Sequence, residues 1–302
     1  MRDRPLPNAA MRVACLGDSI TKGDNTTHTY TELLQKRLLA SWPRAEVLNF
    51  GVNRAVASAV CPPGPWPCFP YASTASLPAA LAATPTVVVI MLGTNDYLLG
   101  TARLLEKGLL ALVEQFLRLT QQPRILLATP PPLLWASEAQ ANRSSGSIRA
   151  LSLMMPAQIW CIAEQARRAG LGLSPPLDTY HAFLPPRAAK GAGGALVDAY
   201  GHERGSVPGC ASARAGTRCS LFQDDGVHPN GKGNALIAER VARAIREPPS
   251  WAPQWAGEEQ AHACCLLRNN RAKFAHCAQS QVLPALLAES NHREGEGFHI
   301  LV

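Results

Sequence analysis

The fold is decided by a stretch near the start of the chain, Val13-Ala14-Cys15-Leu16-Gly17-Asp18-Ser19-Ile20-Thr21. Its apolar first half predicts a short buried strand, and the glycine ends that strand where a polar triplet begins. A serine on a turn between a strand and a helix can hold its hydroxyl over the carboxyl edge of a sheet, where open α/β sheets bind ligands. A lone Gly-Asp-Ser triplet more often caps a helix, so its meaning depends on the rest of the chain.

Segments typical of strands and helices alternate after this stretch. Strands are expected at 45–50, 86–92, 124–129 and, more weakly, 171–177, and helices at 29–40, 77–83, 101–119, 148–169 and 233–245. Such alternation is typical of βαβ units, so the sequence predicts an α/β fold with a parallel sheet covered by helices on both faces. Pro156 is expected to kink or split the fourth of these helices.

Composition divides the 302-residue chain into a domain and its extensions. Residues 1–11 are interpreted as an N-terminal extension, and 12–247 as one domain large enough to bury a substantial core. Within it, 180–222 loses periodicity and is interpreted as an insertion or long loop. Residues 248–302 are interpreted as a C-terminal extension of unknown role.

The charge balance points to no special partner. The formal net charge is +7, but no dense block of Lys and Arg with interleaved aromatic residues is present, so no nucleic-acid partner is expected. The longest apolar run, 87–92, is too short to span a bilayer. The first ten residues lack the apolar core of a secretory signal, so we expect an intracellular protein.

The cysteines favour no metal site. The chain has nine cysteines and no Cys-x-x-Cys pair, so no metal is expected, and reduced thiols are the default in an intracellular protein. Cys61 and Cys68, or Cys210 and Cys219, could pair in an oxidising compartment, and spacing alone leaves this open.

Four turns carry residues suited to acyl transfer, which needs a nucleophile, a base, a group that orients the base and donors for the oxyanion. Ser19 is the candidate nucleophile, and His228 is the candidate base. Asp225, three residues before that histidine, can orient the imidazole. Backbone N–H groups of Ser19 and Gly51 and the side-chain amide of Asn95 are the candidate oxyanion donors. A glycine at position 51 would let the substrate carbonyl approach the backbone closely.

Together, these turns resemble the four sequence blocks of the SGNH, or GDSL-type, hydrolases. The blocks are Gly-Asp-Ser-Ile-Thr around Ser19, Asn-Phe-Gly-Val around Gly51, Gly-Thr-Asn-Asp around Asn95 and Asp-Gly-Val-His-Pro-Asn around His228. The resemblance implies a flavodoxin-like three-layer α/β/α sandwich with a five-stranded parallel sheet. It also implies hydrolysis of carboxylic esters or thioesters without metal or cofactor.

The chain departs from the family pattern after the second block, where many members have a further glycine and this chain has Arg54 nearby. We interpret Arg54, Trp66 and Phe69 as candidate substrate-binding residues. A solvated side chain is the more common role for an arginine such as Arg54, and ordinary loop packing accounts for the two aromatic residues equally well. Residues 17–22 superficially suggest a phosphate loop but lack its Gly-Lys-Ser/Thr order.

The sequence thus predicts a serine hydrolase that cleaves small-molecule esters with small to medium acyl groups through an acyl-enzyme on Ser19. Two alternatives stay open. One is a thioesterase or lysophospholipase on the same scaffold, and the other is a catalytically silent relative that binds a ligand in the same cleft.

Overall fold

The structure is a computed structural model that describes residues 11–24, 26–133, 145–183, 206–207, 210–211, 221–223 and 225–247. Side chains are described for these residues except 145–154, 206–207 and 210–211. Both predicted extensions, except for Met11, and most of the predicted insertion lie outside the described residues.

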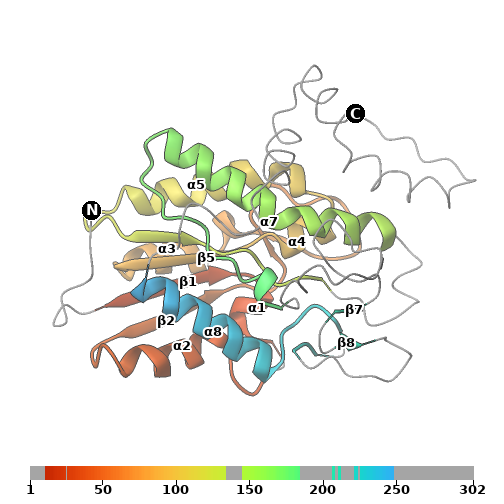
Figure 1. The fold of residues 1–302 in the computed structure, drawn as a ribbon. Coiled ribbons are helices and arrows are strands. Elements are labelled where there is room, and N and C mark those ends of the chain that lie inside the picture. Colours follow the sequence, from red (N-terminus) through yellow and green to blue (C-terminus); the bar gives the residue numbers. More distant parts are fainter. Residues whose placement is uncertain are drawn as a thin grey trace, which may run out of the picture.

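The centre of the molecule is a parallel sheet of four strands in the order β2-β1-β5-β6 (Figure 1). The strands are β1 (Arg12–Gly17), β2 (Glu46–Gly51), β5 (Val87–Met91) and β6 (Arg124–Leu127). All four had been predicted from the sequence. The parallel α/β architecture is therefore confirmed, and β1, which leads to Ser19, lies inside the sheet between β2 and β5.

The fifth strand implied by the resemblance is reduced to a single bridge. Leu177 meets Ala128 in one parallel pairing, and the preceding residues form no strand. Pro175 and Pro176 have no N–H to donate to a sheet. Gly172 has a φ of 64°, outside the strand region. The expectation of a strand at 171–177 was thus wrong in extent, although Leu177 occupies the expected edge.

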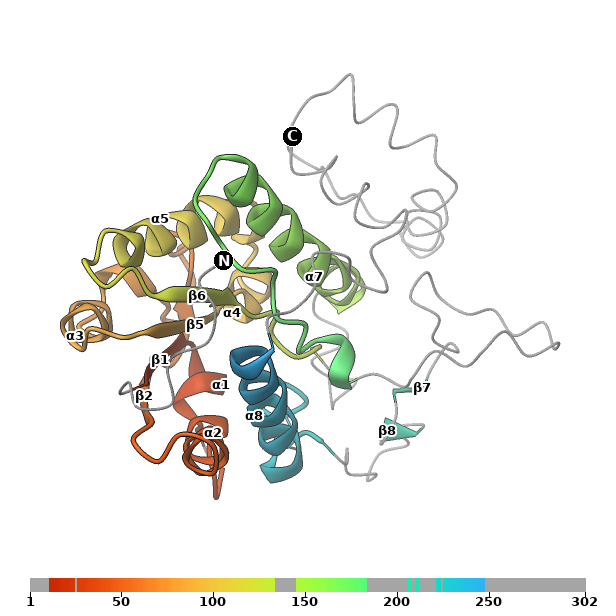
Figure 2. The same ribbon diagram turned by 60° about the vertical axis from the view of Figure 1, so that its left-hand side comes forward.

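Helices cover both faces of the sheet (Figure 2). On one face lie α2 (Tyr30–Leu39) and α8 (Gly231–Arg246), which pack against each other. The other face is covered by α3 (Ser76–Ala82), α5 (Leu105–Leu117) and α7 (Ser145–Arg168). The arrangement is the three-layer α/β/α sandwich that the resemblance implied.

The central strand contributes to both cores because its side chains alternate. Ala14 and Leu16 belong to the α5 and α7 side, whereas Val13 and Cys15 belong to the α2 and α8 side. All four are fully buried. A strand buried on both faces is expected to read as a continuous apolar run, as this one does.

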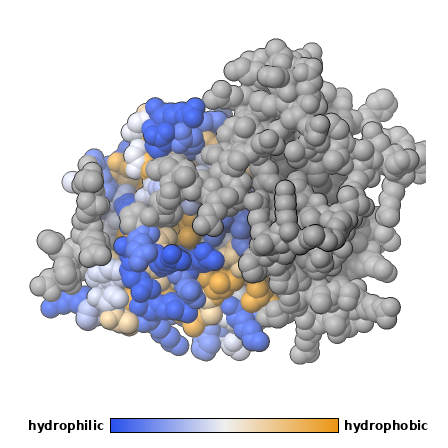
Figure 3. All heavy atoms as spheres, viewed as in Figure 1, coloured by the Kyte–Doolittle hydropathy of each residue, from blue (hydrophilic) through white to orange (hydrophobic). Residues whose placement is uncertain are grey.

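The outer surface of α8 is polar. Figure 3 shows mainly hydrophilic side chains over α2 and α8 on the face viewed in Figure 1. The exposed charged residues of α8 are Lys232, Glu239, Arg240, Arg243 and Arg246. None of the helices in the described ranges is long and apolar enough to cross a membrane.

Helix α7 is one helix that continues through Pro156, so the proline does not split it. A proline inside a helix removes one backbone hydrogen bond. Buried side chains around it, Met155, Ile159 and Ile162, anchor the helix in the core. Their packing holds α7 together at a position where local propensity alone would break it.

Short elements complete the fold around the sheet edge. They are α1 (Ser19–Lys22), α4 (Thr94–Leu98), the 3-10 turns η1 (Tyr71–Ser73), η2 (Ala102–Leu104) and η3 (His181–Phe183), and the strand pairs β3 (Ala55–Val56) with β4 (Phe69–Pro70) and β7 (Ser206–Val207) with β8 (Cys210–Ala211). The predicted helix 101–119 is therefore divided between η2 and α5.

Candidate active site

Ser19 is the first residue of the one-turn helix α1, directly after β1. Asp18 caps this helix by accepting a hydrogen bond from the N–H of Ile20 at 2.9 Å. Gly17 permits the tight turn, since a Cβ there would lie 2.7 Å from the carbonyl oxygen of Met91. The serine is thereby placed at the carboxyl edge of the sheet.

The turn before α8 brings a histidine to this serine. His228 Nε2 lies 2.8 Å from Ser19 Oγ, although the two residues are 209 positions apart in the chain. Its Nδ1 lies 2.5 Å from Asp225 Oδ2. Asp225 Oδ1 accepts hydrogen bonds from the backbone N–H groups of Val227 and His228, each at 2.9 Å. The carboxylate thus fixes both the turn and the imidazole.

The electrostatics of this pair suit a base. Burial alone would raise the pKa of Asp225, but hydrogen bonds from the side chain and backbone of His228 outweigh burial and lower this pKa to about 2. The hydrogen bond to Asp225 in turn raises the pKa of His228, against the effect of burial. An ionised carboxylate at Nδ1 keeps a proton there, so the neutral imidazole presents Nε2 as an acceptor for the serine proton.

The two candidate oxyanion residues flank the serine turn. Gly17 is in register with Gly51 of β2 on one side and with Met91 of β5 on the other, and the turn carrying Asn95 follows β5. Figure 1 shows α1 at the same end of the sheet as α4. The topology therefore gathers three of the four sequence blocks at neighbouring strand ends.

Gly51 does more than was predicted, because its N–H already donates to Asn49 Oδ1 at 2.9 Å. A Cβ at position 51 would lie 2.2 Å from the backbone nitrogen of Lys22. In this structure, close packing of β2 against α1 requires the glycine. To serve an oxyanion, the Gly51 N–H has to share or exchange its bond with Asn49.

Asn95 connects the sheet edge to the segment after Gly51. Its Nδ2 donates to the carbonyl oxygen of Ala55 at 3.0 Å. The neighbouring Asp96 accepts from the N–H groups of Ala57 and Ser58 at 2.9 and 3.0 Å. Burial raises the pKa of Asp96 to about 6, although those N–H groups lower it. An amide nitrogen carries two hydrogens, so Asn95 keeps a second donor for a ligand.

The candidate substrate-binding residues lie in and around the β3–β4 pair: Arg54 precedes β3, Trp66 lies on the connecting loop and Phe69 begins β4. The Arg54 guanidinium lies 5.9 Å from the centre of the Trp66 ring, and Trp66 and Phe69 are 67% and 48% exposed. Arg54 has a φ of 60°, in the left-handed region that favours glycine. Glycine would adopt this conformation without strain, and this chain places an arginine there.

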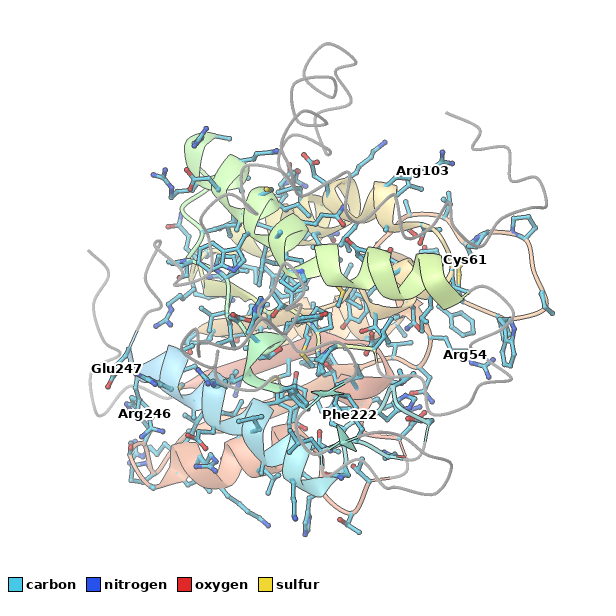
Figure 4. The ribbon with its side chains drawn as sticks, turned by 45° about the vertical axis from the view of Figure 1, so that its right-hand side comes forward. Arg54, Cys61, Arg103, Phe222, Arg246 and Glu247 are labelled. Carbon is cyan, nitrogen blue, oxygen red and sulfur yellow. A yellow bond between two sulfur atoms is a disulfide. The ribbon has the colours of Figure 1, made fainter. Side chains whose placement is uncertain are left out.

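A disulfide between Cys61 and Cys68 closes the same loop. Figure 4 shows Arg54 and Cys61 on the same side of the molecule. The bridge resolves a pairing that spacing alone had left open, and these two cysteines depart from the default of reduced thiols. The parallel pairing of β3 and β4 holds the loop ends together and leaves the two Cα atoms 5.8 Å apart, within disulfide range. The side chains of Cys210 and Cys219 lie outside the described part.

Sequence reasoning missed the role of Asn49. Its Nδ2 donates to the carbonyl oxygen of Thr21 at 2.8 Å and to Thr31 Oγ1 at 3.0 Å, while its Oδ1 accepts from Gly51. This side chain therefore ties β2 to the end of α1 and to α2. Its place two residues before Gly51 was visible, but its partners are distant in sequence.

A second Asp-x-x-His pair was also missed. Asp178 Oδ2 lies 2.9 Å from His181 Nδ1, and Asp178 Oδ1 accepts from the backbone N–H of His181 at 3.0 Å. The identical spacing of Asp225 and His228 was the signal that could have revealed it. This pair follows Leu177, at the same carboxyl edge of the sheet.

Comparison with known proteins agrees with this architecture. Residues 15–159 match the model of the GDSL-like lipase/acylhydrolase family. The native aryl esterase of M. smegmatis is 21% identical, with a TM-score of 0.52 over 80% of this chain and 100% of its own. A carbohydrate acetylesterase family member from Sinorhizobium meliloti is 21% identical, with a TM-score of 0.49 over 78% and 99%. No curated protein matches the chain at a significant level.

The fold and the family match together define the class: the protein is a carboxylic ester hydrolase of the α/β type. The matched region, residues 15–159, contains the Ser19, Gly51 and Asn95 blocks on which the resemblance to this family was stated.

Proposed function

We propose that this protein is a serine hydrolase that cleaves carboxylic esters with small to medium acyl groups through an acyl-enzyme on Ser19. The observation that carries the proposal is the hydrogen-bonded line from Asp225 through His228 to Ser19. Nucleophile, base and orienting carboxylate are the three parts that a covalent acyl-transfer mechanism requires.

In the acylation step, Ser19 Oγ attacks the ester carbonyl and its proton passes to His228 Nε2. The resulting imidazolium is stabilised by Asp225, whose lowered pKa keeps it ionised. Collapse of the tetrahedral intermediate breaks the ester bond, and the imidazolium returns the proton to the departing alcohol. The acyl group is then bound to Ser19.

In the deacylation step, water takes the place of the alcohol. His228 accepts a proton from the water as the water attacks the acyl carbonyl, then returns a proton to Ser19 as the acid leaves. The negative charge of each intermediate is assigned to the N–H groups of Ser19 and Gly51 and to the second amide hydrogen of Asn95.

The acyl group is proposed to be short. Two exposed aromatic side chains, Trp66 on the β3–β4 loop and Phe69 at the start of β4, are candidates for contact with the alcohol part of the ester, together with Arg54. The structural similarity to a protein named as an aryl esterase makes phenyl acetate a sensible first substrate.

The test is a comparison of Ser19→Ala with the wild type on p-nitrophenyl esters from acetyl upward. Removing a catalytic serine costs on the order of a million-fold in turnover, so Ser19→Ala is expected to be inactive. The matched control, Ser41→Ala, changes an exposed serine and is expected to keep full activity. Near-normal turnover in Ser19→Ala would refute the proposal.

The same assay, extended to an acyl thioester and a lysophospholipid, separates the alternatives. A thioesterase or lysophospholipase would show its highest kcat/KM on an acyl thioester or a lysophospholipid. A silent relative would hydrolyse none of the series and would not be labelled by a fluorophosphonate probe, whereas the proposed enzyme is expected to be labelled on Ser19.

The location of the protein stays a prediction from sequence. The bridge between Cys61 and Cys68 favours an oxidising compartment, in which disulfides persist. This observation counts against the intracellular expectation. Thiol titration of the purified protein under non-reducing conditions would show whether the bridge forms.

A further inference from the structure

Asp18 is a buried carboxylate that the mechanism above leaves unused. Its side chain is buried, with 1% of the residue exposed. One oxygen, Oδ1, accepts from Ile20 N–H and caps α1. The other, Oδ2, is buried and has no hydrogen-bond partner among the described residues. A cap needs only one oxygen, so helix capping accounts for only half of this group.

The unpaired oxygen lies in the electrostatic field of the site. Asp18 precedes the nucleophile Ser19 directly, and His228 and Asp18 influence each other's charge. The Thr94 hydroxyl, at the start of α4, lowers the pKa of Asp18 as a hydrogen-bonding group. This hydroxyl is itself buried and makes no hydrogen bond of ordinary geometry to the described residues. Four other titratable groups among the described residues interact with Asp18 or His228. Asp24 and Asp225 raise the pKa of His228, Asp96 raises the pKa of Asp18, and the charge of Asp18 raises the pKa of Tyr30.

Burying a carboxylate with an unsatisfied oxygen is unfavourable. Burial accordingly raises the pKa of Asp18 to about 6, although the Ile20 N–H and the charge on His228 lower it. A positive charge on His228 relieves this cost, because opposite charges attract strongly in a poorly hydrated site. During the reaction, that positive charge forms when the imidazole takes the serine proton.

We propose that Asp18 is a positioning residue for the reaction, which holds α1 through one oxygen and favours the imidazolium form of His228 through its charge. The inference rests on the proposed function. No proton passes to or from Asp18 during turnover above about pH 7, where it is ionised because its pKa is about 6: the serine proton moves to His228 Nε2. Asp225 orients the imidazole from the Nδ1 side, and Asp18 adds a second negative charge near it.

The decisive variant is Asp18→Asn, since asparagine caps a helix as well as aspartate does and has almost the same volume. The variant keeps the cap but loses the charge. We expect the acid limb of the kcat/KM profile on phenyl acetate to move to lower pH by about half to one unit, because a nearby negative charge raises the pKa of the base. Turnover on the plateau is expected to fall roughly ten-fold.

The matched control is Asp24→Asn, which removes another charge that raises the pKa of His228. Asp24 is half-buried rather than fully buried, so its charge is better screened. The acid limb is expected to move less in Asp24→Asn than in Asp18→Asn. An equal movement in both variants would show a general field effect and overturn the specific role of Asp18.

The outcomes separate the two proposals. A wild type that neither hydrolyses esters nor reacts with a fluorophosphonate defeats the proposed function. An active, folded Asp18→Asn protein with an unchanged pH profile and plateau defeats only the role of Asp18 and leaves it as a helix cap.

A second variant and a measurement on the wild type guard against misfolding. Asp18→Ser also caps and also removes the charge, in a smaller side chain. If neither variant folds, the His228 imidazole of the wild type is titrated by NMR, with its resonance assigned by its loss in His228→Gln. Interacting groups titrate as a pair, so a curve flatter than that of one isolated group is expected, and a single-group curve would overturn the inference.

Discussion

Two turns of this molecule have the same local structure and different surroundings. In each, an aspartate three residues before a histidine accepts the backbone N–H of that histidine with one oxygen and contacts its Nδ1 with the other. The first pair is Asp178 and His181, and the second is Asp225 and His228. The motif orients an imidazole in both cases, so the difference lies in what the imidazole faces.

The surroundings are set by the elements that hold each turn. The bridge between Phe222 and Pro229 closes the turn of His228, and α8 follows directly. Gln223 Nε2 donates to the carbonyl oxygen of Asp24, just after α1. These contacts bring His228 to Ser19. The turn of His181 is held instead by Thr129, after β6, whose Oγ1 accepts from two backbone N–H groups of the turn at 3.0 Å.

The largest expected effect tests whether this difference decides function. His228→Gln is expected to lower turnover about a million-fold, as loss of the histidine of a triad does elsewhere. His181→Gln, the matched change, is expected to keep turnover within roughly ten-fold and to lower the free energy of unfolding by about 1 to 2 kcal/mol, because it removes one hydrogen bond to a carboxylate. Steady-state kinetics of both variants give the change in turnover, and urea unfolding gives the change in the free energy of unfolding.

A loss of activity in His181→Gln comparable to that in His228→Gln would break the comparison. It would mean that both imidazoles serve the reaction. Equal unfolding free energies of the wild type and His181→Gln would instead show that the second pair contributes nothing measurable to the fold.

The sequence was sufficient to predict the residues that end strands or begin turns. Ser19, Gly51 and Asn95 each follow a readable strand, and parallel strands bring such ends to one edge. The Asp225–His228 spacing is local, so it was also readable. What could be predicted was therefore the set of groups at the edge, together with the fold that gathers them.

The remainder depended on contacts between distant segments. The bond from Gly51 to Asn49 Oδ1, the uninterrupted helix through Pro156 and the reduction of the fifth strand to Leu177 all result from packing or backbone geometry that local patterns do not encode. The second Asp-x-x-His pair was readable by spacing, but spacing carries no information about what an imidazole faces.

A smaller loss of activity is expected for a change at Asn95. This variant tests the donors for the oxyanion in the site of His228, which the turn of His181 is not expected to share. Asn95→Ala removes a side-chain donor and is expected to lower kcat about a hundred- to a thousand-fold. KM is expected to change little, because the donor acts mainly on the charge that forms in the transition state. Full activity in a folded Asn95→Ala protein would transfer the oxyanion role to other donors.

The control for that variant is Asn234→Ala on α8. Asn234 is buried, and its Nδ2 donates to the carbonyl oxygen of Pro229 at 3.3 Å. Loss of this bond is expected to lower stability while kcat stays within a few-fold of the wild type. Comparing the two asparagines separates a chemical role from a structural one.

The smallest expected effect concerns stability in acid and again distinguishes the two turns. The pKa of Asp225 is lowered to about 2 in the folded protein, from about 3.9 for an ordinary aspartate. A carboxylate with a lowered pKa stabilises the fold above its ordinary pKa, and that contribution is lost as the pH falls through the folded value. Because Asp225 is about half exposed, solvent screening limits the contribution to about 1 kcal/mol or less.

Asp225→Asn should therefore reduce the free energy of unfolding at pH 6 and leave it almost unchanged near pH 2. Urea unfolding of the variant and the wild type at both pH values measures this difference. An identical loss at both pH values would assign the effect to packing rather than to charge.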